Sequence, residues 1–325
     1  MPGANLSGPT PDLPMYAAGY GLMTPYGVWL PPGGRVASFV RSGGAEGYDD
    51  PFLTANLVST LNAGLARCRS GKGDTVIVLP GHAENISTAD FMSSLVAGTN
   101  IVCCGSGNLQ PTFTWTATAS TWLFDVANVT LTGAKLVWNG IDDVVSAIPV
   151  TAAGCTIANC HITVESASAG ALLGVTVGAG ASRFKLSGNT VVSVGEAHPL
   201  TSAVVLVSSA VDDVLIADNY ISAANPGTNV LGLIAVTAAA TNVRILRNTL
   251  IQLETAGTSL FGITVGNVAA TGVMAYNNVH VGTDLVITTA GVTVGAAGLV
   301  GFAMYENRVS DATNTQGALI PVVSA

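Results

Sequence analysis

The chain has 325 residues, of which 49% are hydrophobic and only 9% are charged, and its formal net charge is −8 at pH 7. A soluble globular protein has roughly 25% charged residues, so a large part of this protein's surface is expected to be uncharged. The 11 Lys and Arg residues are spread over the whole length. Nucleic-acid-binding proteins gather such residues into a basic patch, and we therefore expect no nucleic-acid partner.

Residues 1–50 are predicted to form an extended arm. The first 35 are rich in Pro and Gly and show neither a helix nor a strand period, yet they hold more aromatic residues than a disordered linker would. Four of these aromatic residues are candidates for an interface: Tyr16, Tyr20, Tyr26 and Trp29. The arm can order on the body of its own chain or on a neighbouring subunit, and we favour the neighbour.

Residues 51–72 are predicted to form a helix. Asp50 is a suitable capping residue, and Pro51 takes the first helical position, where proline is favoured. Apolar residues follow at helical spacing, namely Phe52, Leu57, Leu61, Leu65 and Cys68. A single amphipathic helix ahead of a stacked β fold covers the first turn, whose backbone groups would otherwise be unpaired. We therefore expect this helix to cap the body.

Residues 73–325 carry a repeat with two columns of apolar residues. One column follows the template apolar-x-apolar-x-x-Asn-x-apolar, as in Val243-x-Ile245-x-x-Asn248-x-Leu250. The Asn position falls at Ala134, Cys160, Asn189, Asn219, Asn248, Asn278 and Asn307. The second column consists of the pairs Ile148/Val150, Val175/Val177, Val205/Val207, Ile234/Val236, Ile263/Val265, Val292/Val294 and Ile320/Val322. Both columns keep one period of roughly 29 residues, which indicates stacked supersecondary units.

This repeat predicts an all-β fold, a right-handed parallel β-helix. The strands are short and no helical pattern separates them, so a βαβ unit is excluded, and right-handed coiling is the rule for parallel crossovers. Val76 to Val78 is the first predicted strand. At ~4.8 Å per coil, about nine coils would make a body roughly 40 Å long. The Asn side chains are expected to form a ladder at a turn, and the last coil is expected to lack a capping element.

Residues 285–304 contain no charged residue and have the nominal length of a membrane span. The strand period continues through this segment, and Gly and Thr interrupt it. We therefore interpret it as β structure and expect no membrane partner.

The sequence predicts no catalytic, cofactor or metal site. The carboxylate pairs within the repeat are Asp142-Asp143 and Asp212-Asp213, and we interpret both as turn residues. None of the four His residues has a second His or a Cys at ligand spacing. We expect His82 to be solvated in a turn, and His280 to point inward with a hydrogen-bond partner. The five cysteines are interpreted as reduced thiols.

An outward column of large apolar residues predicts an interface. Its members are Leu215, Leu246, Met274, Tyr276 and Tyr305, with Tyr220 and Arg308 nearby. An apolar flank of this size usually marks an interaction site. We expect a homo-oligomer, a trimer, that buries the flank. The alternative is that these apolar residues are exposed singly or are covered by turns of the same chain.

The segment Gly73-Asp-Thr-Val-Ile-Val-Leu-Pro-Gly-His-Ala-Glu-Asn-Ile86 resembles a group of tailed-bacteriophage virion proteins. These share a Pro/Gly-rich arm, a short helix, a strand ending in Leu-Pro-Gly-His and a β-solenoid. The resemblance covers residues 20–110, and beyond them only the pectate-lyase-like style of fold is similar. It implies a non-enzymatic structural role in the virion, as a capsid decoration, head fibre or tail component. The protein would be made in the host cytoplasm and anchored to the major capsid protein or another virion protein through its arm.

Two other functions compete with this one. A tailspike-like polysaccharide lyase or hydrolase would need carboxylates for Ca²⁺ with a basic residue, or two carboxylates a few ångströms apart. The sequence shows no such cluster. A bacterial surface adhesin is disfavoured because the residues from Met1 onward do not read as an export signal.

Overall fold

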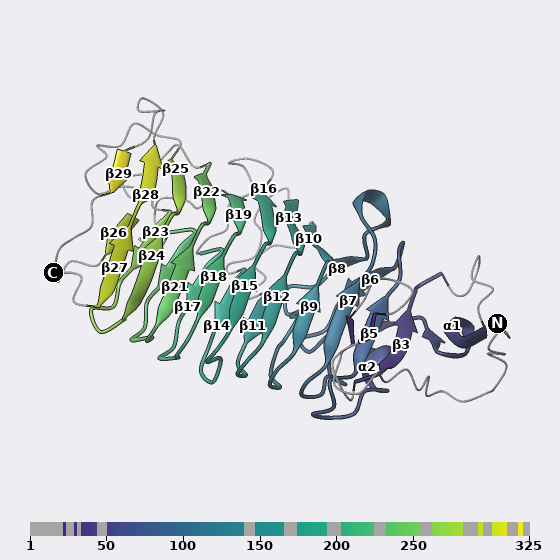
Figure 1. Cartoon of the computed structure of the whole chain (residues 1–325). Helices are drawn as coiled ribbons and strands as arrows, with labels where there is room; N and C mark the ends of the chain where they lie inside the picture. Colours follow the sequence, from purple (N-terminus) through teal and green to yellow (C-terminus); the bar gives the residue numbers. More distant parts are fainter. Residues whose placement is uncertain are drawn as a thin grey trace, which may run out of the picture.

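The computed structural model describes residues 22–23, 29–30, 34–43, 51–139, 147–165, 174–193, 203–223, 232–253, 262–281, 292–294, 301–310 and 318–320. Within these residues the protein is an elongated, parallel β-solenoid with very little helix, as predicted (Figure 1). The right-handed coil stays a prediction. Among the described residues, no helix is long and apolar enough to cross a membrane.

Three sheets run along the body. Sheet 1 has 11 strands in the spatial order β4 (Leu57–Val58), β3 (Val36–Val40), β5 (Thr75–Val78), β7 (Asn100–Cys103), β9 (Thr130–Thr132), β12 (Thr156–Ala158), β15 (Lys185–Ser187), β18 (Leu215–Ala217), β21 (Val243–Leu246), β24 (Gly272–Ala275) and β27 (Phe302–Tyr305). Sheet 2 has 10: β6 (Ala83–Ile86), β8 (Thr112–Trp115), β10 (Lys135–Asn139), β13 (His161–Glu165), β16 (Thr190–Ser193), β19 (Tyr220–Ala223), β22 (Thr249–Gln252), β25 (Asn278–Val281), β28 (Asn307–Ser310) and β29 (Ala318–Ile320). Sheet 3 has six: β11 (Ile148–Val150), β14 (Val175–Val177), β17 (Val205–Val207), β20 (Ile234–Val236), β23 (Ile263–Val265) and β26 (Val292–Val294).

One coil runs from sheet 3 to sheet 1 and then to sheet 2. Sheet 3 has six strands, so the solenoid has about six complete turns, and the predicted count of nine is wrong. Between β5 and β9 the chain extends sheets 1 and 2, but its third side makes only an isolated bridge between Phe124 and Val150. The count of nine treated these partial turns as complete coils.

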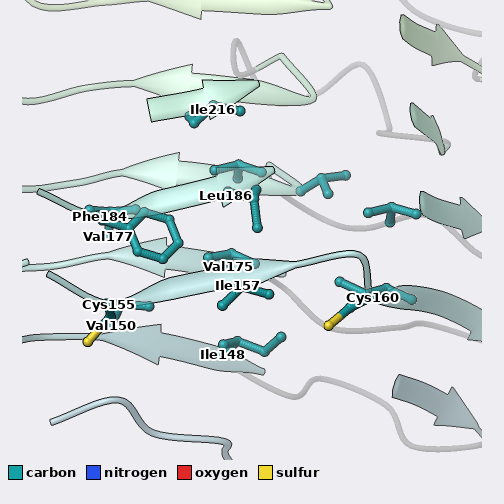
Figure 2. Packing of buried hydrophobic residues seen from close by; sticks show 14 of the residues in the cluster. Ile148, Val150, Cys155, Ile157, Cys160, Val175, Val177, Phe184, Leu186 and Ile216 are labelled. Atoms are coloured by element: carbon teal, nitrogen blue, oxygen red, sulfur yellow. The ribbon is translucent and has the colours of Figure 1, made fainter. Parts of the chain in front are cut away.

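The core is the interior of the solenoid. Apolar side chains from the three sheets point inward and stack on their equivalents in the next coil, as Ile157, Leu186 and Ile216 do in sheet 1 (Figure 2). These side chains are at most 2% exposed. Burying a Val, Leu or Ile side chain stabilises by roughly 1.5–3 kcal/mol, and the stack repeats this gain in every coil.

The predicted helix over residues 51–72 is wrong in extent. The structure has two short helices, α1 (Pro51–Ala55) and α2 (Leu61–Leu65), with β4 between them. Thr60 is the N-cap of α2, because its hydroxyl accepts a hydrogen bond from the Ala63 N–H at 3.3 Å. This cap ends the extended segment and begins the second helix. A Cβ on Gly64 would lie 2.7 Å from Ser38 Oγ, so α2 packs closely against the core side of β3.

The boundary of the predicted arm also needs correction. Residues 36–40 form β3, a strand of sheet 1, so the solenoid begins within the span assigned to the arm. Trp29 lies in β2 (Trp29–Leu30), which pairs antiparallel with β1 (Leu22–Met23), although no strand period was visible there. Tyr16, Tyr20 and Tyr26 lie outside the described residues. Their role as interface residues stays a prediction.

The C-terminal end departs from the repeat. Ile320 was predicted to start another parallel strand pair, but β29 runs antiparallel to β28, with Asn307 opposite Ile320 and Val309 opposite Ala318. The expectation that the last coil lacks a capping element is therefore wrong for sheet 2. An edge strand exposes unpaired backbone groups, and the reversed strand covers those of β28. Val322 lies outside the described residues.

Candidate functional site

The corner between sheet 1 and sheet 2 has the same backbone in successive coils. Its first residue has a positive φ: 68° at Gly188, 59° at Asp218, 52° at Arg247, 60° at Tyr276 and 46° at Glu306. The next residue points inward, and it is Asn189, Asn219, Asn248, Asn277 or Asn307. The left-handed residue turns its own side chain outward, so the corner exposes one variable residue per coil.

The inward Asn side chains form a hydrogen-bonded ladder. The side-chain amide of each Asn donates to Oδ1 of the next one, at 3.0 Å from Asn219 to Asn248 and 2.9 Å from Asn248 to Asn277. Oδ1 of Asn277 also accepts from the backbone N–H of Asn248 at 3.0 Å, while the second amide hydrogen of Asn277 goes to the Ile245 carbonyl at 2.8 Å. All five Asn residues are at most 2% exposed. The predicted ladder is confirmed.

One member of the ladder was assigned to the wrong residue. The template placed Asn278 in the Asn column, but Asn277 is the buried member and Asn278 is exposed on sheet 2. The same shift of one residue affects His280. Val279 takes the inward position, and His280 lies on the outer face with Nδ1 3.0 Å from Ser310 Oγ. The inward placement of His280 is therefore wrong.

Three tyrosines gather at this corner and its borders. Tyr276 occupies the left-handed corner position and is 52% exposed, Tyr305 ends β27 and is 44% exposed, and Tyr220 begins β19 and is 40% exposed. Tyr276 and Tyr305 lie on adjacent coils, since the Tyr276 N–H donates to the Tyr305 carbonyl at 3.1 Å. The structure thus brings these three predicted interface residues to one edge of the body.

The outer face of sheet 1 continues this apolar surface. Leu215 and Leu246 lie half-buried on that face, as predicted. Met274 does not, because it is fully buried in the core. Val273 is the outward residue of its strand, opposite Arg244 of the neighbouring strand. We call the surface formed by Leu215, Tyr220, Leu246, Val273, Tyr276 and Tyr305 the tyrosine flank.

An exposed ion pair borders the tyrosine flank. Arg247 Nε and its terminal nitrogen donate to the two carboxylate oxygens of Asp218 at 2.7 and 2.8 Å. These hydrogen bonds lower the pKa of Asp218 below its ordinary value. Because both side chains are about half exposed, the pair contributes little to stability.

A second Arg–Asp contact is buried at the N-terminal end. Asp74 accepts from the Arg69 backbone N–H at 2.9 Å and from its side chain at 2.9 and 2.7 Å, and Arg35 Nε lies 3.6 Å away. Burial alone would raise the pKa of Asp74, but the hydrogen bonds from Arg69 outweigh it and lower that pKa. The carboxylate joins the start of β3, the segment after α2 and the start of β5. No pattern in the sequence predicted this contact.

His82 was predicted to be solvated, and that is wrong. Its side chain is fully buried, with Nε2 3.0 Å from Glu84 Oε2 and its ring against Phe113. The same Glu84 oxygen accepts the Leu61 N–H, the first of α2, at 2.8 Å. Glu84 is in register with the buried Phe113. A carboxylate facing the core is stabilised here because it caps α2 and binds a histidine.

The carboxylate pairs give no catalytic arrangement in the described part of the chain. Asp212 accepts from the Thr241 hydroxyl and Asp213 from the Asn242 amide. Asp213 has a φ of 60°, in agreement with a turn position. Asp142 and Asp143 lie outside the described residues. Within those residues, no group of three or more His, Cys, Asp or Glu side chains is arranged to hold a metal ion.

We expect the cysteines to resist alkylation in the folded protein. All five are free thiols, and Cys103, Cys155 and Cys160 are buried. Burial raises the pKa of Cys160 to about 12, that of Cys68 to about 11 and that of Cys103 well above its ordinary value. Since the thiolate is the reactive form, labelling with iodoacetamide at pH 8 should be at least ~100-fold slower at Cys160 than in the denatured chain. Fast labelling of Cys160 in the native protein would contradict its buried position.

Comparison of the chain with protein-family models, with curated proteins and with solved structures finds no match.

Proposed function

We propose that the protein is a non-enzymatic structural component of a tailed-bacteriophage particle, a capsid decoration, head fibre or related part, which assembles as a homotrimer. The observation that carries the proposal is the tyrosine flank. Tyr220, Tyr276 and Tyr305 are 40–52% exposed at one corner of a regular body. Tyrosine is strongly enriched among the residues that dominate binding energy at protein interfaces.

The resemblance of residues 73–86 to phage virion proteins supports the biological setting. This segment forms β5, the following turn and β6, which are strands of sheets 1 and 2 near the N-terminal end of the solenoid. The arm is proposed to attach the protein to the major capsid protein or to another virion protein.

Replacing the tyrosines of the flank should weaken self-association. We expect the double variant Tyr276→Ser/Tyr305→Ser to raise the dissociation constant of the oligomer at least ~10-fold, since each aromatic anchor contributes roughly 1–2 kcal/mol or more. Sedimentation equilibrium measures this change. Leu109→Ser is the matched control, because Leu109 is 60% exposed and lies in the 3₁₀ turn Gly107–Leu109, away from the flank. A wild-type protein that stays monomeric at high micromolar concentration would contradict the assembly proposal.

Deleting residues 1–33 tests the attachment. This deletion keeps Arg35, which lies beside Asp74 and whose carbonyl accepts the Thr75 N–H, and it leaves β3 in place. We expect the truncated protein to keep its thermal unfolding transition and to lose its association with purified particles in a co-sedimentation assay. Binding that survives the deletion would overturn the role of the arm. Release of reducing sugar ends from host surface polysaccharide by the full-length protein would favour the polysaccharide lyase or hydrolase instead.

A further inference from the structure

Two opposite charges flank the corner between β27 and β28. Glu306 occupies the left-handed corner position with a φ of 46°, and Arg308 is the first outward residue of sheet 2 after that corner. Both side chains are exposed. Within the described residues, neither takes part in an ion pair. The last corner therefore presents an acid and a base at the same height along the body, and neither charge is neutralised in the described part of the chain.

The edge between sheet 1 and sheet 2 has two unlike sides. On the sheet 1 side, the outward residues next to the corner include Leu246 at the end of β21 and Tyr305 at the end of β27. On the sheet 2 side they include Tyr220 at the start of β19 and Arg308 in β28. The corner positions between the two sides hold Asp218, Arg247, Tyr276 and Glu306. The edge is thus apolar and aromatic along much of its length, with unpaired opposite charges at its last corner.

We propose that the axis of the homotrimer runs along this edge, parallel to the solenoids, so that the sheet 1 side of one copy contacts the sheet 2 side of the next. This inference rests on the proposed trimer and names its contact. Threefold symmetry about such an axis places equal coils at equal height. Glu306 of one copy then meets Arg308 of its neighbour, and Tyr305 lies against the same guanidinium, an arrangement that favours both an ion pair and a cation–π contact. The contact repeats head to tail and closes into a ring.

The charges along the edge fit a threefold axis. Such an axis brings the three copies of each corner residue close together. The three Arg247 side chains are tolerated because each donates to Asp218 of its own chain, at 2.7 and 2.8 Å. The three Glu306 carboxylates have no such partner among the described residues, so Arg308 of the neighbouring copy is the cation that neutralises each of them. Arg244 lies three residues ahead of its corner, farther along the sheet 1 face and away from this line of contact.

A charge swap within one chain tests the contact. We expect Glu306→Arg and Arg308→Glu each to raise the dissociation constant of the trimer on the order of 100-fold, because like charges then meet at every interface. The variant carrying both substitutions should regain most of the affinity, because each pair is restored with reversed polarity. Arginine is compatible with the corner, since Arg247 has a φ of 52° in the equivalent position. Sedimentation equilibrium gives the constants, and circular dichroism melting verifies that each variant is folded.

Lys72→Glu is the matched control for Arg308→Glu. It makes the same change in net charge at an exposed position in the turn before β5, away from the edge. We expect this variant to leave the dissociation constant unchanged.

The outcomes separate this inference from the assembly itself. An oligomeric wild type whose constant is unaffected by either single reversal, or whose double variant is no better than the singles, overturns the Glu306–Arg308 contact and leaves the assembly standing. A monomeric wild type overturns both. If a single variant fails to fold, Glu306→Gln and Arg308→Gln replace the reversals, and each should then weaken the trimer roughly 10-fold.

Discussion

Replacing Asn277 with Ala should lower the free energy of unfolding by about 4 kcal/mol. The substitution removes the oxygen that accepts both the backbone N–H and the side-chain amide of Asn248. Asn248 is fully buried, and each buried donor left unpaired costs about 1–3 kcal/mol. The Ile245 carbonyl also loses a donor. Urea unfolding followed by circular dichroism measures the change.

Asn278→Ala is the matched control for this experiment. Asn278 is the next residue in the chain and has the same side chain, but it is exposed on the outer face of β25. An exposed substitution away from special contacts changes stability by no more than about 0.5 kcal/mol. If Asn278→Ala proved the costly variant and Asn277→Ala the neutral one, the ladder would run through the residue that the sequence template selects, and the register of the corner would be wrong.

Replacing Asp74 with Ala should lower the free energy of unfolding by about 3 kcal/mol at pH 7. Removing one partner of a buried ion pair costs roughly 3–5 kcal/mol, and the lower end applies because Arg69 and Arg35 are 48% and 34% exposed and can regain water. The backbone N–H of Arg69 also loses its acceptor. Asp218→Ala is the control, since it breaks the same bidentate contact with an arginine at an exposed position. There we expect a loss of at most about 1 kcal/mol.

The effect of Asp74 should depend on pH in a defined direction. The pKa of Asp74 is lowered in the folded protein from its ordinary 3.8, so the native state holds the charged form more tightly than the unfolded chain does. The stabilisation is complete above pH 3.8 and is lost as the pH falls through the folded value. The difference between wild type and Asp74→Ala should therefore shrink when unfolding is measured at pH 3 instead of pH 7. A difference that grows on acidification would contradict the contact with Arg69.

Much of the architecture could be predicted, because the repeat shows which side chains point into the solenoid and which point outward. Pairs such as Val175/Val177 recur once per coil and were found in sheet 3 in parallel register. The ladder of Asn189, Asn219, Asn248 and Asn307 also follows from the spacing. The period alone did not show whether Asn277 or Asn278 belongs to the ladder, because both are asparagines and the corner residue that precedes the ladder residue differs from coil to coil. The signal that separates them is the left-handed φ at Tyr276, which is a property of the backbone.

The residues of the candidate site could be predicted only in part from the sequence. Leu215, Leu246, Tyr220, Tyr276 and Tyr305 were placed on one flank, since a strand period assigns faces reliably. Met274 was placed with them in error, because the template was aligned one residue too late in that coil, with Asn278 in the position that Asn277 occupies.

The sequence by itself determined a parallel solenoid, the period of its coils and the apolar side chains that fill it, since these follow from local periodicity. Tertiary structure alone decided the two ends, where the period stops. There α2 packs through Gly64 against β3, Glu84 caps that helix, Asp74 joins three segments, and β29 reverses to cover β28. These contacts join residues far apart in the chain, and they exist only because the last coils of a stack must pair backbone and bury surface that no neighbouring repeat covers.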